Sequence, residues 1–201
     1  YNPDPNAAHG TIVAGIIGAA QNGIGGMGVA PRVKIGGVPL IGNGMESINT
    51  MLDAYGNAPW AKKSHVINAS YGNDRYAQNY FSDPSVYAIR AMRNHRDQKG
   101  IVYIKSAGNE FSIMGTASGA TLPCGNLTAL FDCINPANDP STLEPNSIVV
   151  AAMNAKGIVS SYSSAGSNVW ISGLGGEDGG IGNYGEKTRH SHRLGYDDGP
   201  K

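Results

Sequence analysis

The sequence predicts an α/β fold, with a mostly parallel sheet covered by helices on both faces. Two observations support this class. Short β-branched runs alternate along the chain with segments of helical periodicity, and glycine makes up 29 of the 201 residues. Alternating strands and helices imply right-handed crossovers, which place neighbouring strands parallel. Abundant glycine suits tightly packed layers and turns. The length fits one domain, residues 1–201, with its own core.

The expected elements follow one another in regular order. A helix begins at His9, because Val13, Ile16 and Ile17 recur at the spacing of one helix face. A β-branched run at 29–40, bounded by proline, reads as a strand. Next come a helix over 45–63 and a buried strand over 65–70. A helix then runs from 82 to a stop at Gly100, with Val86, Ile89 and Met92 on one face. The remaining elements are strands over 101–108, 147–153 and 168–172.

The loop between the first helix and the first strand contains "GIGGMG", Gly23–Gly28, which matches the dinucleotide fingerprint G-x-G-x-x-G. That fingerprint works where a strand enters the glycines and a helix leaves them, since the helix N-terminus must face the pyrophosphate. Here a helix enters and a strand leaves. We therefore expect no nucleotide at this loop.

Composition excludes several partners. Lys+Arg and Asp+Glu number 15 each, so the formal net charge is zero and no basic face favours nucleic acid. No apolar run approaches the roughly 20 residues of a membrane span, and we expect no membrane partner. The chain begins at Tyr1 without methionine, so any signal or pro-segment is expected to have been removed or to lie outside these residues. Nothing in the sequence indicates the oligomeric state.

Two cysteines, Cys124 and Cys133, lie nine residues apart in a loop rich in Gly, Asn and Pro. Without a second cysteine pair or a nearby histidine, a metal site is not expected, and a local disulfide is the favoured interpretation. The alternative is a pair of small unpaired residues. A disulfide would indicate an extracytoplasmic, secreted protein.

Polar residues gather where the predicted strands end. Asn68–Gly72 ends one strand and Gly108–Glu110 ends the next, while His9 begins the first helix. In a parallel sheet the carboxyl ends of strands share one edge, where loops and helix N-termini converge. These positions form a candidate site.

Several motifs resemble the subtilisin-like serine proteases in order and spacing, over about residues 9–175. They are "HGTIVAG" with "GVAP" downstream, "VINASYG", "SAGNE" and "SIVVAA…SSYSSAGSNVWIS". The resemblance implies a three-layer subtilisin-like fold, peptide or protein substrates, and hydrolysis by a Ser-His-Asp mechanism. The segments "NPDPNAAHGT" and "VWISGLGGEDG" also resemble the kexin branch of that family.

The resemblance assigns catalytic roles to two residues. His9 would be the general base that accepts a proton from a serine hydroxyl; the alternative is a capping or surface histidine. Asn109, behind Gly108, would donate its side-chain amide to the oxygen of the tetrahedral intermediate; the alternative is a turn-forming asparagine.

The same resemblance assigns a substrate-binding edge. Ser70, Tyr71 and Gly72 would expose backbone groups to which an extended peptide adds as a β-strand. Asn68 is expected to hold this edge through buried hydrogen bonds. Glu110 and Asp74 lie near the expected cleft, but the sequence does not fix the residue preferred at the cleavage site.

A structural calcium ion is also implied, because the family uses the glycine-rich loop to bind it. Hard cations prefer backbone and amide oxygens. The candidate ligands are the carbonyls of Ala20, Ile24 and Gly26 and the side chain of Asn22. A metal-free turn is the alternative, since the family completes this site with residues upstream of the histidine.

The chain departs from the family at two catalytic motifs. Asp4 lies too close to the histidine to be the orienting carboxylate, and Asp197 and Asp198 follow no core strand. The nucleophile motif G-T-S-x-x-A-P is absent: neither the serines at 160–164 nor Ser191 has its surroundings. Either this is the middle of a catalytic domain, incomplete at both ends, or a degenerate member that only binds peptides. The joint occurrence of the histidine and asparagine motifs favours the first, and the chain alone is expected to be inactive.

Overall fold

The computed structural model describes residues 8–38, 40, 47–72, 84–109, 135–160 and 162–176. The chain divides into two compact units, Tyr1–Ser47 with Gly179–Lys201, and Ile48–Asp178. Each unit is described by itself, and a single domain over 1–201 stays a prediction. Within the described segments, no helix has the length and apolar character needed to cross a membrane.

The first unit contains helix α1, Ala8–Gly18, as expected from the sequence. The glycine-rich loop folds back on the last turn of this helix. The amides of Val29 and Ala30 donate to the carbonyls of Ile16 and Ile17, at 3.0 and 2.8 Å. These bonds satisfy carbonyls that the end of a helix leaves without a partner. A Cβ at Gly28 would collide with the backbone at Ala19, so only glycine fits this return.

The strand expected at 29–40 does not form. The described residues from Val33 to Val38 belong to no helix or strand. A strand exists only where a neighbouring strand accepts and donates its backbone hydrogen bonds. No other strand lies among the described residues of the first unit. The β-branched composition alone therefore gave a wrong prediction here.

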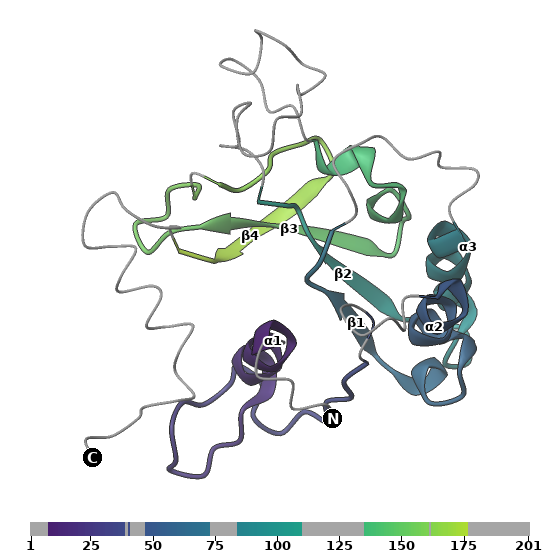
Figure 1. Cartoon of the computed structure of the whole chain (residues 1–201), viewed down its shortest axis with the longest axis horizontal. Coiled ribbons are helices and arrows are strands. Elements are labelled where there is room, and N and C mark those ends of the chain that lie inside the picture. The colour runs from purple at the N-terminus through teal and green to yellow at the C-terminus, as the bar shows by residue number, and fades with distance from the viewer. Residues whose placement is uncertain are drawn as a thin grey trace, which may run out of the picture. The chain divides into compact units, whose positions relative to one another are not determined.

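The second unit holds a four-stranded sheet in the order β1-β2-β3-β4 (Figure 1). The strands are Val66–Ala69 (β1), Val102–Ser106 (β2), Ser147–Met153 (β3) and Val169–Leu174 (β4). All three neighbouring pairs are parallel, and the order in the sheet equals the order in the chain. The predicted α/β class and parallel sheet are confirmed.

The helices of this unit are short. Helix α3 spans Pro84–Ala91, with the proline in its first turn as expected, and a 3-10 turn (η3, Met92–Asn94) extends it, so the helical segment ends before the stop predicted at Gly100. The helix expected over 45–63 is broken into α2 (Ile48–Leu52), a π-helical turn (η1, Asp53–Asn57) and a 3-10 turn (η2, Ala61–Lys63). Gly56 has a φ of 116°, which no helix accommodates. Two further 3-10 turns are η5 (Pro136–Asn138) and η6 (Pro140–Thr142).

The core lies between one face of the sheet and these helices. Figure 1 shows α2 and α3 together beside β1 and β2. The predicted face of α3 is buried, with Val86, Ile89 and Met92 no more than 1% exposed. Ile89 and Met92 belong to one cluster with Tyr103 of β2. The expectation that β1 is buried was wrong for Val66, which is 50% exposed, because β1 is the edge strand of the described sheet.

Candidate active site

The parallel register of β1 and β2 brings two of the three predicted polar clusters together. Ala69, the last residue of β1, pairs with Lys105 of β2. Both strands run in the same direction, so Ser70–Gly72 and Ala107–Asn109 leave the sheet side by side at its carboxyl edge. This edge combines the expected substrate-binding segment with the expected oxyanion donor.

The backbone leading to Asn109 is fixed on two sides. The amide of Ala107 donates to the carbonyl of Val150 in β3 at 2.9 Å, and the carbonyl of Gly108 accepts from the amide of Ser164 at 3.0 Å. Gly108 has a φ of 110°, a conformation that residues with a side chain rarely adopt. Glycine before the asparagine is thus a requirement of the backbone. The turn places Asn109 three residues after Ser106, the last residue of β2.

Of the serines at 160–164, the structure describes Ser160, Ser163 and Ser164, while Ser161 lies outside the described residues. Ser160, Ser163 and Ser164 are no more than 1% exposed. The hydroxyl of Ser160 donates to the carbonyl of Gly176, and that of Ser163 accepts from the amide of Ala152 at 2.8 Å. Buried hydroxyls occupied in this way cannot attack a peptide in solution, which agrees with the sequence argument against a nucleophile here.

The expected role of Asn68 needs correction. Its side-chain amide does donate to the hydroxyl of Ser70, at 2.9 Å, but this contact is exposed to solvent. Alternation along β1 explains the difference: Ala69 faces the core, so Asn68 faces the opposite side of the sheet. A solvent-exposed bond between two neutral groups adds little stability.

The substrate-binding segment is instead held from the core by residues that the sequence analysis did not single out. The phenol of Tyr55 bonds to those of Tyr71 and Tyr103, the latter at 3.1 Å. Lys105, 4% exposed, donates from its Nζ to the backbone carbonyl of Tyr71. Its ammonium also lies 3.6 Å from a carboxylate oxygen of Asp139.

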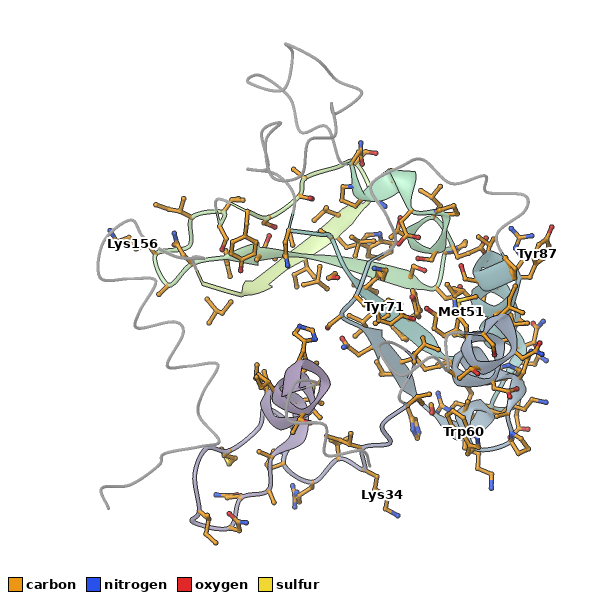
Figure 2. All side chains as sticks on the ribbon, viewed as in Figure 1. Lys34, Met51, Trp60, Tyr71, Tyr87 and Lys156 are labelled. Carbon is orange, nitrogen blue, oxygen red and sulfur yellow. The ribbon has the colours of Figure 1, made fainter. Side chains whose placement is uncertain are left out.

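Burial decides the chemical state of this cluster. Loss of solvent raises the pKa of Tyr55, Tyr71 and Tyr103 well above that of an exposed phenol, with a further rise from the tyrosines beside them. All three are therefore neutral at physiological pH and act as hydrogen-bonding groups. Figure 2 shows Tyr71 and Met51 on the side of the sheet that faces the helices, and both pack against the core cluster. The sequence feature that could have revealed this cluster is Lys105, a charged residue within the mostly apolar strand predicted over 101–108.

His9 is the second residue of α1, at the beginning of the helix as predicted, and its side chain is exposed. It belongs to the first unit, whereas Ser70–Gly72 and Asn109 belong to the second. Each is placed only within its own unit. Glu110, Cys124 and Cys133 lie outside the described residues, and the disulfide stays a prediction.

The candidate calcium ligands all lie in a described part of the chain, and calcium binding stays a prediction. Gly23 and Gly25 both have positive φ, at 77° and 63°, a conformation that residues with a side chain rarely adopt. The Oδ1 of Asn22 accepts from the amide of Ile24 at 3.0 Å, and an amide oxygen has a second lone pair for a cation. Asn22 and the carbonyls of Ala20, Ile24 and Gly26 remain the candidate ligands. The loop itself contains no carboxylate.

Calcium is expected to raise the melting temperature of a longer polypeptide that includes residues upstream of His9. Selective binding to the folded state stabilises it by an amount that grows with the ratio of calcium concentration to Kd. Thermal unfolding should be followed with millimolar calcium, with magnesium and with a chelator. Asn22→Asp, which adds a charge to the ligand set, should enlarge the calcium-dependent shift, and Asn22→Ala should reduce it. Identical melting curves in all conditions would mean that the loop does not bind calcium and is a metal-free turn.

The fold and the edge at β1 and β2 define the class of protein. The subtilase family model matches residues 1–194, and the chain therefore belongs to the subtilase family. It is 36% identical over 181 residues to an extracellular serine protease of Aeromonas sobria, covering 88% of this chain and 28% of that protein. Subtilisin E of Bacillus subtilis is 33% identical over 168 residues, covering 81% of this chain and 35% of the relative.

Solved structures agree with this assignment. The serine protease of Aeromonas sobria in complex with its chaperone superposes with a TM-score of 0.72 at 34% identity, covering 88% of this chain and 30% of that chain. The psychrophilic subtilisin-like protease Apa1 of Pseudoalteromonas superposes with a TM-score of 0.54 at 23% identity, which shows the fold alone. The chain thus spans about a third or less of the relatives it matches most. The kexin branch stays a prediction.

Proposed function

We propose that this chain is the part of a serine endopeptidase domain that supplies the general base and an oxyanion donor. The enzyme would hydrolyse peptide bonds by a Ser-His-Asp mechanism. The observation that carries the proposal is the edge where Ser70–Gly72 and Gly108–Asn109 leave β1 and β2 side by side. An extended binding segment beside a fixed donor is what acyl transfer on a peptide requires. Membership in the subtilase family supports the same chemistry.

Each group has a defined task in this mechanism. The peptide adds as a strand to Ser70–Gly72, which places its scissile carbonyl near Asn109. A serine hydroxyl attacks while His9 takes its proton, and the amide of Asn109 donates to the oxyanion that forms. His9 then returns the proton to the leaving amine. The serine and the orienting carboxylate would come from a longer polypeptide, because neither motif occurs in these 201 residues.

The proposal extends to the partners and location of the protein. Its substrates would be peptides or proteins, with no nucleic acid or membrane involved. A local Cys124–Cys133 disulfide and a secreted, extracytoplasmic location are proposed together, because disulfides persist in oxidising compartments. The Aeromonas sobria relative is described as extracellular, which supports this location. Calcium would have a structural role.

A catalytically inactive, peptide-binding member of the family is the second candidate. In this case the Asp and Ser motifs, which do not occur in these 201 residues, would be missing from the whole polypeptide as well. Such a protein would use the same edge at Ser70–Gly72 to hold an extended peptide without cleaving it.

A protease assay with a serine-directed phosphonate separates the two candidates. The 201-residue chain should not hydrolyse peptides, because two members of the triad are missing. A longer polypeptide from the same reading frame, carrying D-x-G and G-T-S-x-x-A-P, should hydrolyse them and lose all activity to the phosphonate. Phosphonate-sensitive cleavage by the short chain would show that the nucleophile has been misidentified. A longer polypeptide that lacks these motifs and only binds peptide would favour the inactive member.

A further inference from the structure

We propose that Lys105 is a positioning residue for the substrate-binding edge: its ammonium group holds the carbonyl of Tyr71 and so aims the backbone of Ser70 and Gly72 at the substrate. This inference rests on the proposed function. The ammonium group is buried at the carboxyl end of β2, directly behind the segment to which a peptide would add.

The placement of Lys105 follows from the register of the sheet. Lys105 pairs with Ala69, and paired residues on parallel strands point to the same face. Ala69 is buried on the core face, so Lys105 enters the core as well. From there its four-carbon side chain passes forward to the carbonyl of Tyr71, two residues beyond the end of β1.

A bond to the Tyr71 carbonyl determines which backbone groups remain for a substrate. Along an extended chain, the carbonyls of successive residues point to opposite sides. In an extended segment, a Tyr71 carbonyl bonded to Lys105 of β2 therefore leaves the carbonyls of Ser70 and Gly72 directed to the opposite edge, away from β2. These are the groups that an added strand needs. The hydrogen bond from Lys105 thus determines which backbone groups of residues 70–72 are available to pair with a substrate strand.

The side chain of Tyr71 supplies a second anchor to the same segment. Its phenol bonds to Tyr55, which in turn bonds to Tyr103 of β2. The rings of Tyr55 and Tyr103 meet edge to face at 5.3 Å. The ammonium of Lys105 also lies 5.5 Å from the centre of the Tyr71 ring, where a cation is attracted to the aromatic face. The phenol of Tyr71 is therefore held by Tyr55, while Lys105 contacts both the carbonyl and the ring of Tyr71.

Asp139 balances the buried charge. Its Oδ2 lies 3.6 Å from Nζ of Lys105. Its Oδ1 accepts from the amide and the hydroxyl of Ser141, at 2.9 and 2.6 Å, at the start of η6. A buried ammonium without a carboxylate would be costly. Because Asp139 keeps the Ser141 bonds when Lys105 is replaced, Lys105→Met leaves no carboxylate without hydrogen bonds.

The first experiment measures the edge itself in the 201-residue chain, and does not depend on catalysis. In Lys105→Met, amide hydrogen exchange of the peptide covering 66–72 should become about tenfold faster, while α3 keeps its protection. Lys99→Met, at an exposed position after α3, is the matched control and should change neither. Asp139→Asn leaves the buried ammonium without its carboxylate, so exchange at 66–72 should become faster by at least as much as in Lys105→Met.

The second experiment uses the longer polypeptide and two substrates. Lys105→Met should raise KM for a tetrapeptide amide about tenfold with kcat within about twofold, because the edge binds ground state and transition state alike. KM for a single-residue ester, which does not extend along the edge, should stay unchanged. A general structural defect would weaken both substrates.

The outcomes separate this inference from the proposed function. An inactive wild-type longer polypeptide would refute the protease, and exchange at 66–72 would still decide the role of Lys105. Unchanged exchange in Lys105→Met, or equal rises of KM for both substrates, would overturn the positioning role. If amide exchange in α3 also becomes faster in Lys105→Met, the substitution has loosened the core, and Asp139→Asn then tests the inference. That variant has to speed exchange at 66–72 while α3 keeps its protection; otherwise the inference fails.

Discussion

His9→Ala is expected to abolish turnover in a longer polypeptide that carries the Asp and Ser motifs. Without the imidazole, no group in the site takes the proton of the serine hydroxyl or returns it to the leaving amine. Members of a Ser-His-Asp triad act as a unit, so the loss of one removes most of the rate acceleration, roughly 10⁴-fold or more. The measurement is kcat/KM on a peptide amide.

His65→Ala is the matched control for this prediction. His65 is exposed just before β1, and its backbone carbonyl, which the substitution retains, accepts from the amide of Val102. Its kcat/KM should equal that of the wild type. Peptide binding by His9→Ala, measured as a competitive Ki, should also be retained. Full activity without the imidazole would mean that another residue is the base.

Asn109→Ala is expected to lower kcat by about 10²- to 10³-fold with little change in KM. This magnitude comes from oxyanion-donor substitution in subtilisin, a member of the same family, and is carried over from that relative. The split between the two constants has a physical reason. The side-chain amide is placed for the oxyanion of the tetrahedral intermediate and contributes little to binding the planar carbonyl of the substrate.

Two variants define the test of Asn109. Asn109→Asp keeps the size of the side chain but replaces the amide donor with acceptors, so it should lose at least as much kcat as the alanine variant. Asn94→Ala, at an exposed position after α3, should leave both constants unchanged. A rise in KM with kcat unchanged would assign Asn109 to substrate binding and remove it from the oxyanion site.

Features set by neighbours in the sequence were predictable. The spacing of Val86, Ile89 and Met92 identified the buried face of α3, because helical period and burial depend on the same side chains. The parallel pairing of β1 with β2 followed from the helix expected between them, where the structure has α3. The same reasoning does not extend to β3 and β4, since the described residues between them contain no helix. The two polar loops at the carboxyl edge followed from the pairing of β1 with β2, before any contact between them was known.

Features set by distant partners were not predictable. The run at 29–40 has the composition of a strand, but strand formation depends on a neighbour that composition does not specify. The role of Lys105 depends on the carbonyl of Tyr71 and the carboxylate of Asp139, each 34 residues away in the sequence. A lysine in an apolar strand shows only that some partner must exist.

The hydrogen bond between the amide of Ser164 and the carbonyl of Gly108 links two loops 56 residues apart. Any insertion or deletion that displaces Ser164 would also remove the support of the residue before Asn109. The connection between β3 and β4 is therefore not a free site for redesign, although neither of the proposed catalytic residues lies in it. Length changes there have to leave the backbone amide of Ser164 in place, and the buried side chain of Ser164 limits what can replace it.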